Sequence, residues 1–326
     1  MRPRGWRSFL ITCAVGWAVL ASAGAGYAIF KHLPAGLALP LTAAFLIEYT
    51  FFLVPGFEGL REWISDRIPP RTIAAGLALS ALLPYLVYSL GSGEFRVIPA
   101  ARLAALVLAL SFWYILRKPS PTADLALLAL VAAAVVARFF KQIYTSPNPS
   151  VDILSALGKL MLIRLYAGVM LILREVEGTG YGFLPTANEW RIGLRYYLYY
   201  LPVGAALFFG LGLAHFRTSP TLLAVAPLYF LGVLWGLALG EEFLARGLLQ
   251  KWISDWTGNP PLGLILASIA FGASHLWFRD FPNWRWAITA TALGWFCGKA
   301  FNQGGGIRAA MVTHALVVTT WQTLLS

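Results

Sequence analysis

The sequence predicts an all-α fold, a polytopic membrane helix bundle of about 11 transmembrane helices, with a range of roughly 8–12. Composition is the first reason: 59% of the 326 residues are hydrophobic and 12% are charged, whereas soluble domains carry about 25% charged residues. Uncharged stretches of roughly 20 residues recur along the chain, and each is long enough as a helix to cross a hydrocarbon core about 30 Å thick.

Pro, Gly or charged residues separate the apolar segments from one another, as in "VPGFEGLREWISDRIPPR" (54–71) and "RKPSPTAD" (117–124). The expected spans are 8–30, 34–54, 72–90, 98–116, 121–140, 151–173, 192–214, 220–247, 260–276, 286–303 and 307–325. The first span follows a basic start and contains Ala21-Ser22-Ala23, which imitates a signal peptide. Because its apolar character continues to Phe30, an uncleaved helix is favoured over a cleaved leader.

Charge predicts how the chain lies in the membrane. Lys and Arg are in excess in the loops on the side of the N-terminus, which places that end inside, provided that 151–173 is a true span. The formal net charge of +11 then belongs to cytoplasmic loops. No nucleic acid partner is expected, because no basic cluster alternates with aromatic residues outside the spans.

The chain is expected to form two regions. Residues 1–173 are mostly simple Ala/Leu helices of unknown role, whereas 174–326 contain three of the four histidines and begin with the polar connector "REVEGTGYGFLPTANEWR" (174–191). Glu48 is an acid inside an apolar span, and it is either functional or hydrogen-bonded to a neighbouring helix. Cys13 and Cys297 lie in apolar segments and are assigned to packing, since neither has a partner at metal-ligand spacing.

Two adjacent acids interrupt the apolar segment at 220–247. On a helix Glu242 faces Arg246, four residues later, whereas Glu241 is rotated by about 100° and is left without that partner. Taken alone, this pattern favours a salt-bridged helix end at the membrane surface over a functional site. His275 and His314 in the following apolar helices change the interpretation. Two histidines and an unpaired glutamate can hold a water molecule, take its proton and stabilise an oxyanion.

The segments "EEFLAR" (241–246), "FGASH" (271–275) and "GWFCGKAFNQGGGIRAAMVTH" (294–314) resemble the three motifs of the CPBP family. This family comprises membrane-embedded CAAX-processing endopeptidases and bacteriocin-processing or self-immunity proteins. The resemblance covers about residues 220–326 within the region 174–326. It implies a multi-pass integral membrane protein of a prokaryotic cytoplasmic membrane, and as partners a peptide or protein substrate, lipid-modified or membrane-delivered, and the lipid bilayer.

The resemblance also implies catalytic roles. Glu241 would activate water as the general base, His275 would help to hold that water, and His314 would stabilise the oxyanion. Glu242 and Arg246 would fix the geometry of Glu241 through their ion pair. The family position four residues after the last histidine is usually polar, commonly Asn, but it is Val318 here; Thr319 or another group substitutes, or activity is low or lost.

No cofactor is favoured, because a carboxylate-activated water needs no metal; zinc bound by Glu241, His275 and His314 is the alternative. For Glu241 to meet His275, the helix that starts at Pro220 has to continue through Arg246 towards Trp252.

The predicted function is therefore a membrane-embedded endopeptidase that hydrolyses a peptide bond by glutamate-activated water. A catalytically silent binding or immunity protein of the same fold is the alternative that Val318 favours. A transporter is a third hypothesis, suggested by the many spans and Glu48 but disfavoured because no inverted repeat is visible. The substrate, the face to which the cavity opens and the oligomeric state stay open.

Overall fold

A computed structural model describes residues 5–149, 151, 153–216 and 219–325, and within these residues all regular structure is helical. The chain divides into two compact units, Met1–Val176 and Glu177–Ser326. The boundary between the two regions that the sequence predicts lies a few residues earlier, after residue 173. The all-α class predicted from composition is confirmed.

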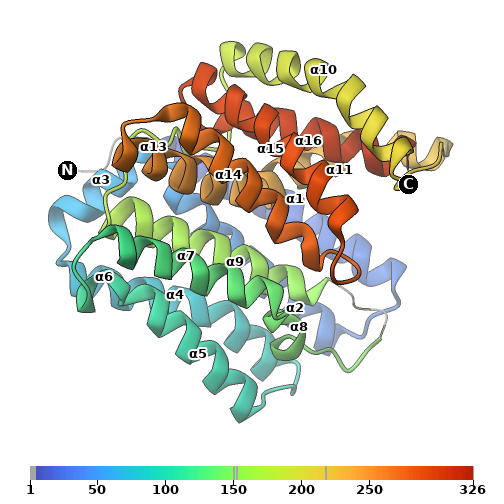
Figure 1. The fold of residues 1–326 in the computed structure, drawn as a ribbon. Helices are drawn as coiled ribbons and strands as arrows, with labels where there is room; N and C mark the ends of the chain where they lie inside the picture. Colours follow the sequence, from blue (N-terminus) through green and yellow to red (C-terminus); the bar gives the residue numbers. More distant parts are fainter. Residues whose placement is uncertain (1–4, 150, 152, 217–218, 326) are drawn as a thin grey trace. The chain divides into compact units, whose positions relative to one another are not determined.

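The first unit consists of helices that follow one another along the chain with short connections (Figure 1). Its elements are α1 (Trp6–Phe30), α2 (Ala35–Leu53), η1 (Val54–Gly56), α3 (Glu58–Arg67), α4 (Pro70–Gly91), α5 (Val97–Ser111), α6 (Trp113–Leu116), α7 (Pro121–Val136), α8 (Phe139–Ile143), α9 (Leu154–Gly168) and η2 (Val169–Leu173).

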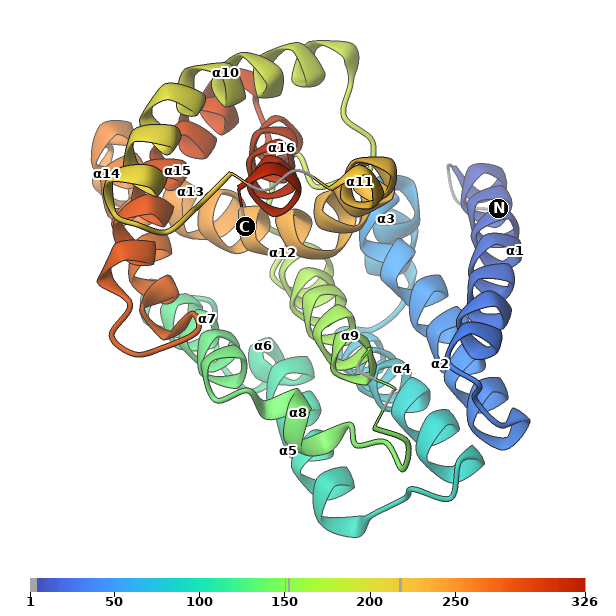
Figure 2. The ribbon, with the colours of Figure 1, turned by 90° about the vertical axis from the view of Figure 1, so that its right-hand side faces the viewer.

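The second unit surrounds its last helix. Its elements are α10 (Ala187–Gly210), α11 (Pro220–Gly232), η3 (Val233–Ala238), α12 (Leu239–Glu242), η4 (Phe243–Gln250), α13 (Lys251–Thr257), α14 (Pro260–Ser274), η5 (His275–Trp277), α15 (Trp284–Gly304) and α16 (Ile307–Leu324). Helix α16 contacts α10, α11, α12 and α15, and Figure 2 shows it nearly end-on among them.

The predicted spans fall on helical segments, although 98–116 covers both α5 and α6 and 121–140 covers α7 and the start of α8. The helices also differ in how apolar they are. Within the described residues, six are long and apolar enough to cross a membrane: Trp6–Phe30, Ala35–Gly56, Pro70–Gly91, Leu154–Leu173, Pro220–Thr257 and Pro260–Trp277. Val97–Ser111 and Pro121–Val136 are shorter apolar helices. The expected spans at 192–214, 286–303 and 307–325 correspond to α10, α15 and α16, which are less apolar than those six.

The connector at 54–71 is more ordered than the sequence suggests. It contains η1 and the ten-residue helix α3, which has Glu58 in its first turn and Arg67 in its last. These charges complement the helix dipole at both ends. A charged segment of this length contains no apolar run that would predict a helix. The sequence therefore indicates only a connection between two spans.

A buried ion pair joins three helices of the first unit. Arg164 of α9 donates from Nε and Nη2 to the two carboxylate oxygens of Glu48 in α2, at 2.6 and 3.1 Å. Its remaining donors bind the hydroxyl and the carbonyl oxygen of Ser80 in α4, at 3.0 and 2.6 Å. Both charged side chains are almost fully buried. This pairing accounts for Glu48 as a structural residue, and the transporter hypothesis thereby loses the residue that suggested it.

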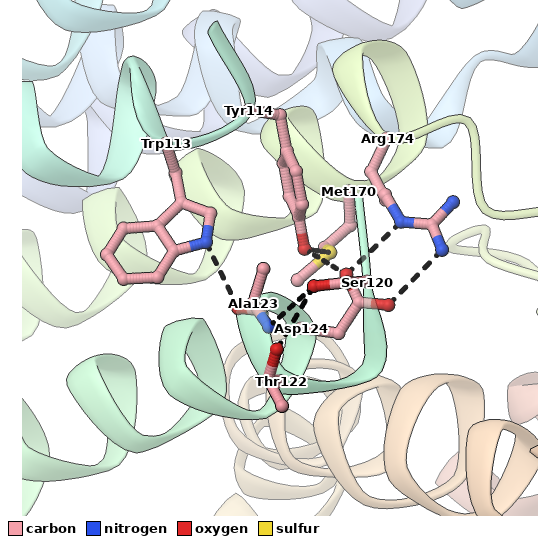
Figure 3. Close-up of polar contacts among 8 residues, drawn as sticks. All are labelled: Trp113, Tyr114, Ser120, Thr122, Ala123, Asp124, Met170 and Arg174. Atoms are coloured by element: carbon pink, nitrogen blue, oxygen red, sulfur yellow. Dashed lines mark hydrogen bonds and ion pairs between the residues drawn. The ribbon is translucent and has the colours of Figure 1, made fainter. Parts of the chain in front are cut away.

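A second polar cluster fixes the start of α7, as Figure 3 shows. The buried carboxylate of Asp124 accepts a hydrogen bond from the Tyr114 hydroxyl at 2.6 Å and two from Arg174 at 3.2 Å each. The Ser120 hydroxyl caps the helix by accepting from the backbone N–H of Ala123 at 3.2 Å. Because Arg174 directly follows η2, this cluster ties the last helical turn of the first unit to the α6–α7 turn.

Replacing Glu48 by alanine should destabilise the first unit strongly, because Arg164 would be left as an uncompensated buried charge. Breaking such a pair costs about 3–5 kcal/mol. We therefore expect Glu48→Ala to lower the midpoint of thermal unfolding of the detergent-solubilised protein. The matched control is Lys159→Ala, which removes an exposed charge from α9 and should leave the midpoint unchanged. Equal midpoints for both variants would contradict the structural role of the pair.

Candidate functional site

The two acids at 241 and 242 lie in the interior of one long helix. The segment Pro220–Thr257 is continuous through α11, η3, α12, η4 and α13, so the predicted continuation of this helix past Arg246 is confirmed. The short segment Leu239–Glu242 lies between two π-helical segments, η3 and η4. π-helical turns are rare in proteins overall, and those that occur are often found at functional sites.

Glu242 is a fully buried carboxylate with two cationic or hydrogen-bonding partners. Its Oε1 lies 2.7 Å from Nδ1 of His314, and its Oε2 lies 3.3 Å from Nε of Arg246, which forms the ion pair expected from the spacing. The Arg246 side chain is also fully buried, and its guanidinium lies over the ring of Phe271 at 4.9 Å. The negative charge of Glu242 is therefore compensated inside the protein.

Glu241 lies in a different environment from its neighbour. Its side chain is 33% exposed, and its Oε2 is 3.8 Å from Nε2 of His314. That oxygen is buried and accepts no hydrogen bond within the described residues. A separation of 3.8 Å is too long for a direct hydrogen bond, but a water molecule can contact both atoms at ordinary hydrogen-bond distances.

His314 connects the two acids. It lies in the tightly packed first half of α16, where Ala309–Ala315 are all buried, and its ring meets that of Phe271 edge-on at 5.8 Å. Because a carboxylate can only accept a hydrogen bond, the short contact to Glu242 assigns a proton to Nδ1. Glu242 thus fixes the ring so that Nε2 is presented to Glu241.

His275 reaches this group only through an aromatic ring. It begins η5, directly after α14, and its Nδ1 lies 2.9 Å from the carbonyl oxygen of Phe271 and 3.2 Å from the Ser274 hydroxyl. Its ring packs on Phe271 at 4.9 Å. Within the described residues no hydrogen bond or ion pair joins His275 to Glu241. The structure thus brings Glu241, Glu242, Arg246 and His314 into direct contact and places His275 at the edge of the group.

Cys297 belongs to this cluster, although its sequence context indicates only packing. It is a buried residue of α15, and its Sγ lies within 4.8 Å of ligand atoms of Glu242 and His314. The glycines on either side explain the close approach of α15: a Cβ at Gly294 would meet Ser268, and one at Gly298 would meet Leu264 and Gln250. The Gly-x-x-Cys-Gly pattern at 294–298 is the signal in the sequence that could have identified it.

The set of donor atoms does not favour a cation. The buried side chains whose ligand atoms come together are those of Glu242, Cys297 and His314, rather than the predicted zinc ligands Glu241, His275 and His314. Arg246 already supplies a fixed positive charge beside Glu242, and a divalent cation at the same carboxylate would be repelled by it. The residues present therefore fit zinc poorly.

Position 318 provides no hydrogen-bond donor. Val318 is half-buried, four residues after His314, and the two side chains share one face of α16. Thr319 has a buried hydroxyl oxygen with no hydrogen-bond partner among the described residues. At about 100° per residue, however, the Thr319 side chain is directed roughly 140° away from that of His314. Its placement does not favour it as the substitute donor.

The connector that begins the second unit holds the site elements together. The backbone N–H of Ile307 donates to the Thr179 carbonyl at 2.9 Å, which ties α16 to the connector. The indole N–H of Trp235 in η3 donates to the Phe183 carbonyl at 2.8 Å. Tyr181 packs edge-on against Phe243 of η4 at 4.9 Å. The connector therefore contacts the segments on both sides of the acids and the helix that carries His314.

Comparison with known proteins agrees with the resemblance seen in the motifs. Residues 223–320 match the model of a family described as type II CAAX prenyl endopeptidase Rce1-like, so this part of the chain carries a domain of that family. The matched range contains all five predicted catalytic residues. The family is one of membrane proteases, and it implies a peptide substrate and a bilayer environment.

One curated relative is the uncharacterized protein YpbD of Bacillus subtilis (strain 168), which is 32% identical over 81 residues. The match covers 25% of this chain and 37% of that protein, so it spans well under half of the relative's length. No solved structure shows a significant match to the chain.

Gly180 should be more sensitive to substitution than Gly178 in the same connector. Both have positive φ, +62° and +69°, so alanine is strained at either position. A Cβ at Gly180 would lie 2.6 Å from the backbone Cα of Gly306, whereas one at Gly178 would meet only the flexible end of Lys251 at 3.5 Å. We expect Gly180→Ala to lower the thermal midpoint clearly more than Gly178→Ala. Equal shifts would show that the close approach to α16 is unimportant.

Proposed function

We propose that the second unit hydrolyses a peptide bond within or near the membrane, with water activated by Glu241 and without a metal ion. The single observation that supports this most is the arrangement of His314 between the two acids: Nδ1 is 2.7 Å from buried Glu242, and Nε2 is 3.8 Å from partly exposed Glu241. The Rce1-like domain at 223–320 supports the reaction class.

The chemistry follows from the different surroundings of the two acids. Glu241 accepts a proton from the water molecule as the water oxygen forms a bond to the carbonyl carbon of the scissile peptide. The N–H group at Nε2 of His314 donates to the oxyanion that develops. The C–N bond then breaks, and the proton held by Glu241 passes to the leaving amine. General-base catalysis of this kind contributes roughly 10²–10⁴ in rate.

Glu242 and Arg246 act on the reaction through His314. With a proton on both ring nitrogens, His314 adds a second positive charge to that of Arg246, and these two charges balance those of Glu241 and Glu242. A buried site with balanced charges avoids the large cost of an uncompensated ion. We propose that His275 supports the same site at its edge, since its ring is linked to His314 through Phe271.

The substrate class follows the family description. We propose that the chain acts on peptides carrying a prenylated or other lipid-modified residue, because the family name specifies CAAX prenyl endopeptidases. The second candidate function, a catalytically silent binding or immunity protein, is favoured by one observation, the valine at 318.

Glu241→Gln should strongly reduce cleavage while preserving the fold. Purified protein in proteoliposomes is offered peptides with a prenylated cysteine, and unmodified peptides of the same sequence, and product is measured by mass spectrometry. We expect the rate for Glu241→Gln to fall by about 10²–10⁴, and the exposed control Glu177→Gln to match the wild type. Cleavage that survives in Glu241→Gln would refute its role. Wild-type protein that binds the peptides but cleaves none would favour the silent alternative.

Val318→Asn should increase the rate, because it adds a donor on the face of α16 that carries His314. Oxyanion-hole donors are typically worth about 10²–10³ in rate, so an increase of tenfold or more is expected in the same assay. Thr319→Val is the matched comparison, and it should leave the rate unchanged. A large loss of rate in Thr319→Val would instead identify Thr319 as the donor.

A further inference from the structure

The proposed reaction leaves one buried side chain of the site without a role. Cys297 of α15 is completely buried, and its Sγ lies within 4.8 Å of ligand atoms of Glu242 and His314. The chain has one other cysteine, Cys13, which is partly buried in α1, a helix without acidic residues. The two thiols therefore have different surroundings, and only that of Cys297 lies beside a charged group of the candidate site.

The ion pair beside this thiol is not completed by an aligned hydrogen bond. Nε of Arg246 lies 3.3 Å from Oε2 of Glu242. That oxygen and all three guanidinium nitrogens are nevertheless buried without a hydrogen-bond partner in the part of the chain that the structure describes. Buried donors and acceptors that lack a partner are costly. A further polar group is therefore expected to interact with this pair.

A thiol has the chemistry to interact with both members of the pair. Its S–H group is a weak donor and its sulfur is a weak acceptor. The Cys297 thiol lies within hydrogen-bonding reach of the Glu242 carboxylate and of the Arg246 guanidinium. Because a thiol is neutral, it can donate to one group and accept from the other without altering the balance of charges in the site.

Gln250 holds the thiol and the ion pair at a fixed separation. It belongs to η4, the same π-helical segment as Arg246, and its side chain is buried. Its Nε2 donates to the carbonyl oxygen of Gly298 at 3.3 Å and to Oδ1 of Asn302 at 2.8 Å. Since Gly298 directly follows Cys297, these bonds join the segment that carries the guanidinium to the turn of α15 that carries the thiol.

The surroundings of Cys297 disfavour a role as the nucleophile. Its side chain has no exposed surface, so the sulfur cannot reach the carbonyl carbon of a peptide. The attacking form would be the thiolate, and no base is available to generate it. Nδ1 of His314 is bonded to Glu242 at 2.7 Å, and Nε2 lies 3.8 Å from Glu241. A neutral thiol that acts as a donor fits this arrangement better.

We infer that the Cys297 thiol donates a hydrogen bond to Glu242 and accepts one from Arg246, and that this bridge holds Glu242 in the orientation that fixes His314. Cys297 is then a positioning residue, which acts through Glu242 and does not contact the substrate. The inference deepens the proposed function. Its kinetic consequence rests on that function, whereas the hydrogen bond can be measured without turnover.

The first test is the infrared S–H stretching band of the full-length protein in detergent. Cys13→Ala leaves Cys297 as the only thiol, and Cys297→Ala leaves Cys13 as the reference. We expect the band of Cys297 at a lower frequency than that of Cys13, because a carboxylate acceptor weakens the S–H bond. In the Cys13→Ala protein, Glu242→Gln should raise the frequency. The matched control Glu241→Gln should leave it unchanged.

Either of two infrared results overturns the inference. One is a Cys297 band at the frequency of the Cys13 reference, a comparison that does not require Glu242→Gln to fold. The other is a band that Glu242→Gln leaves unchanged in folded protein. A lowered frequency that responds only to Glu242→Gln supports the inference even if the wild type cleaves no peptide, in which case the proposed function alone fails.

The second test is the cleavage assay in proteoliposomes. We expect Cys297→Ala to lower kcat about tenfold, the effect of losing one hydrogen bond to a charged group, with little change in KM because the substrate does not contact this residue. Cys297→Ser should restore most of kcat, since a hydroxyl also donates and accepts. Cys13→Ala is the control and should match the wild type.

The kinetic outcomes separate the inference from the proposed function. Wild-type kcat in Cys297→Ala overturns the positioning role, even though the proposed function then stands. A Cys297→Ser variant that is as inactive as Cys297→Ala would assign the sulfur itself to the reaction and would also overturn the inference. Loss of kcat in Cys297→Ala with recovery in Cys297→Ser supports it.

Discussion

The second unit depends on a single buried carboxylate. Glu242 is fully enclosed and carries a charge that is costly to bury alone, so its surroundings must supply compensation. Arg246 does so from the same helix, and His314 does so from α16. The contact with His314 joins the long helix to the central helix of the unit and sets the orientation of the imidazole. The same interactions therefore stabilise the packing of the unit and determine the geometry of the candidate site.

The connector at 177–186 supports the same arrangement through hydrogen bonds that its backbone carbonyl groups accept. It bonds to η3 through the Phe183 carbonyl and to the start of α16 through the Thr179 carbonyl. At the far end of the connector, Thr186 and Glu189 form a capping box for α10. Glu189 also accepts a hydrogen bond from Arg308 at 2.9 Å. The elements that carry the acids and His314 are thus held by hydrogen bonds to carbonyl oxygens of the connector and by a salt bridge outside the site.

The sequence predicts the helices well because apolar runs of about 20 residues are a strong signal. It also predicts the Glu242–Arg246 pair, since both residues lie on one helix at a fixed spacing. It does not predict that Cys297 lies beside Glu242 and His314, because this placement depends on which faces of α15 and α16 meet. The contact between Glu242 and His314 joins residues 72 positions apart, and a spacing along one helix cannot reveal it. Helix α3 is missed because its residues are mostly polar.

The length of the helix Pro220–Thr257 has a consequence for where a substrate can be reached. From Pro220 to Gly240 the rise is about 31 Å at 1.5 Å per residue, close to the full hydrocarbon thickness of about 30 Å. An upright helix would therefore bring Glu241 to the level of the lipid headgroups. A tilt of about 40°, at the upper end of what membrane helices adopt, would lower it by roughly 6 Å into the hydrocarbon. The inclination of one helix thus sets whether an incoming chain meets the acids at the headgroups or has to enter the lipid first.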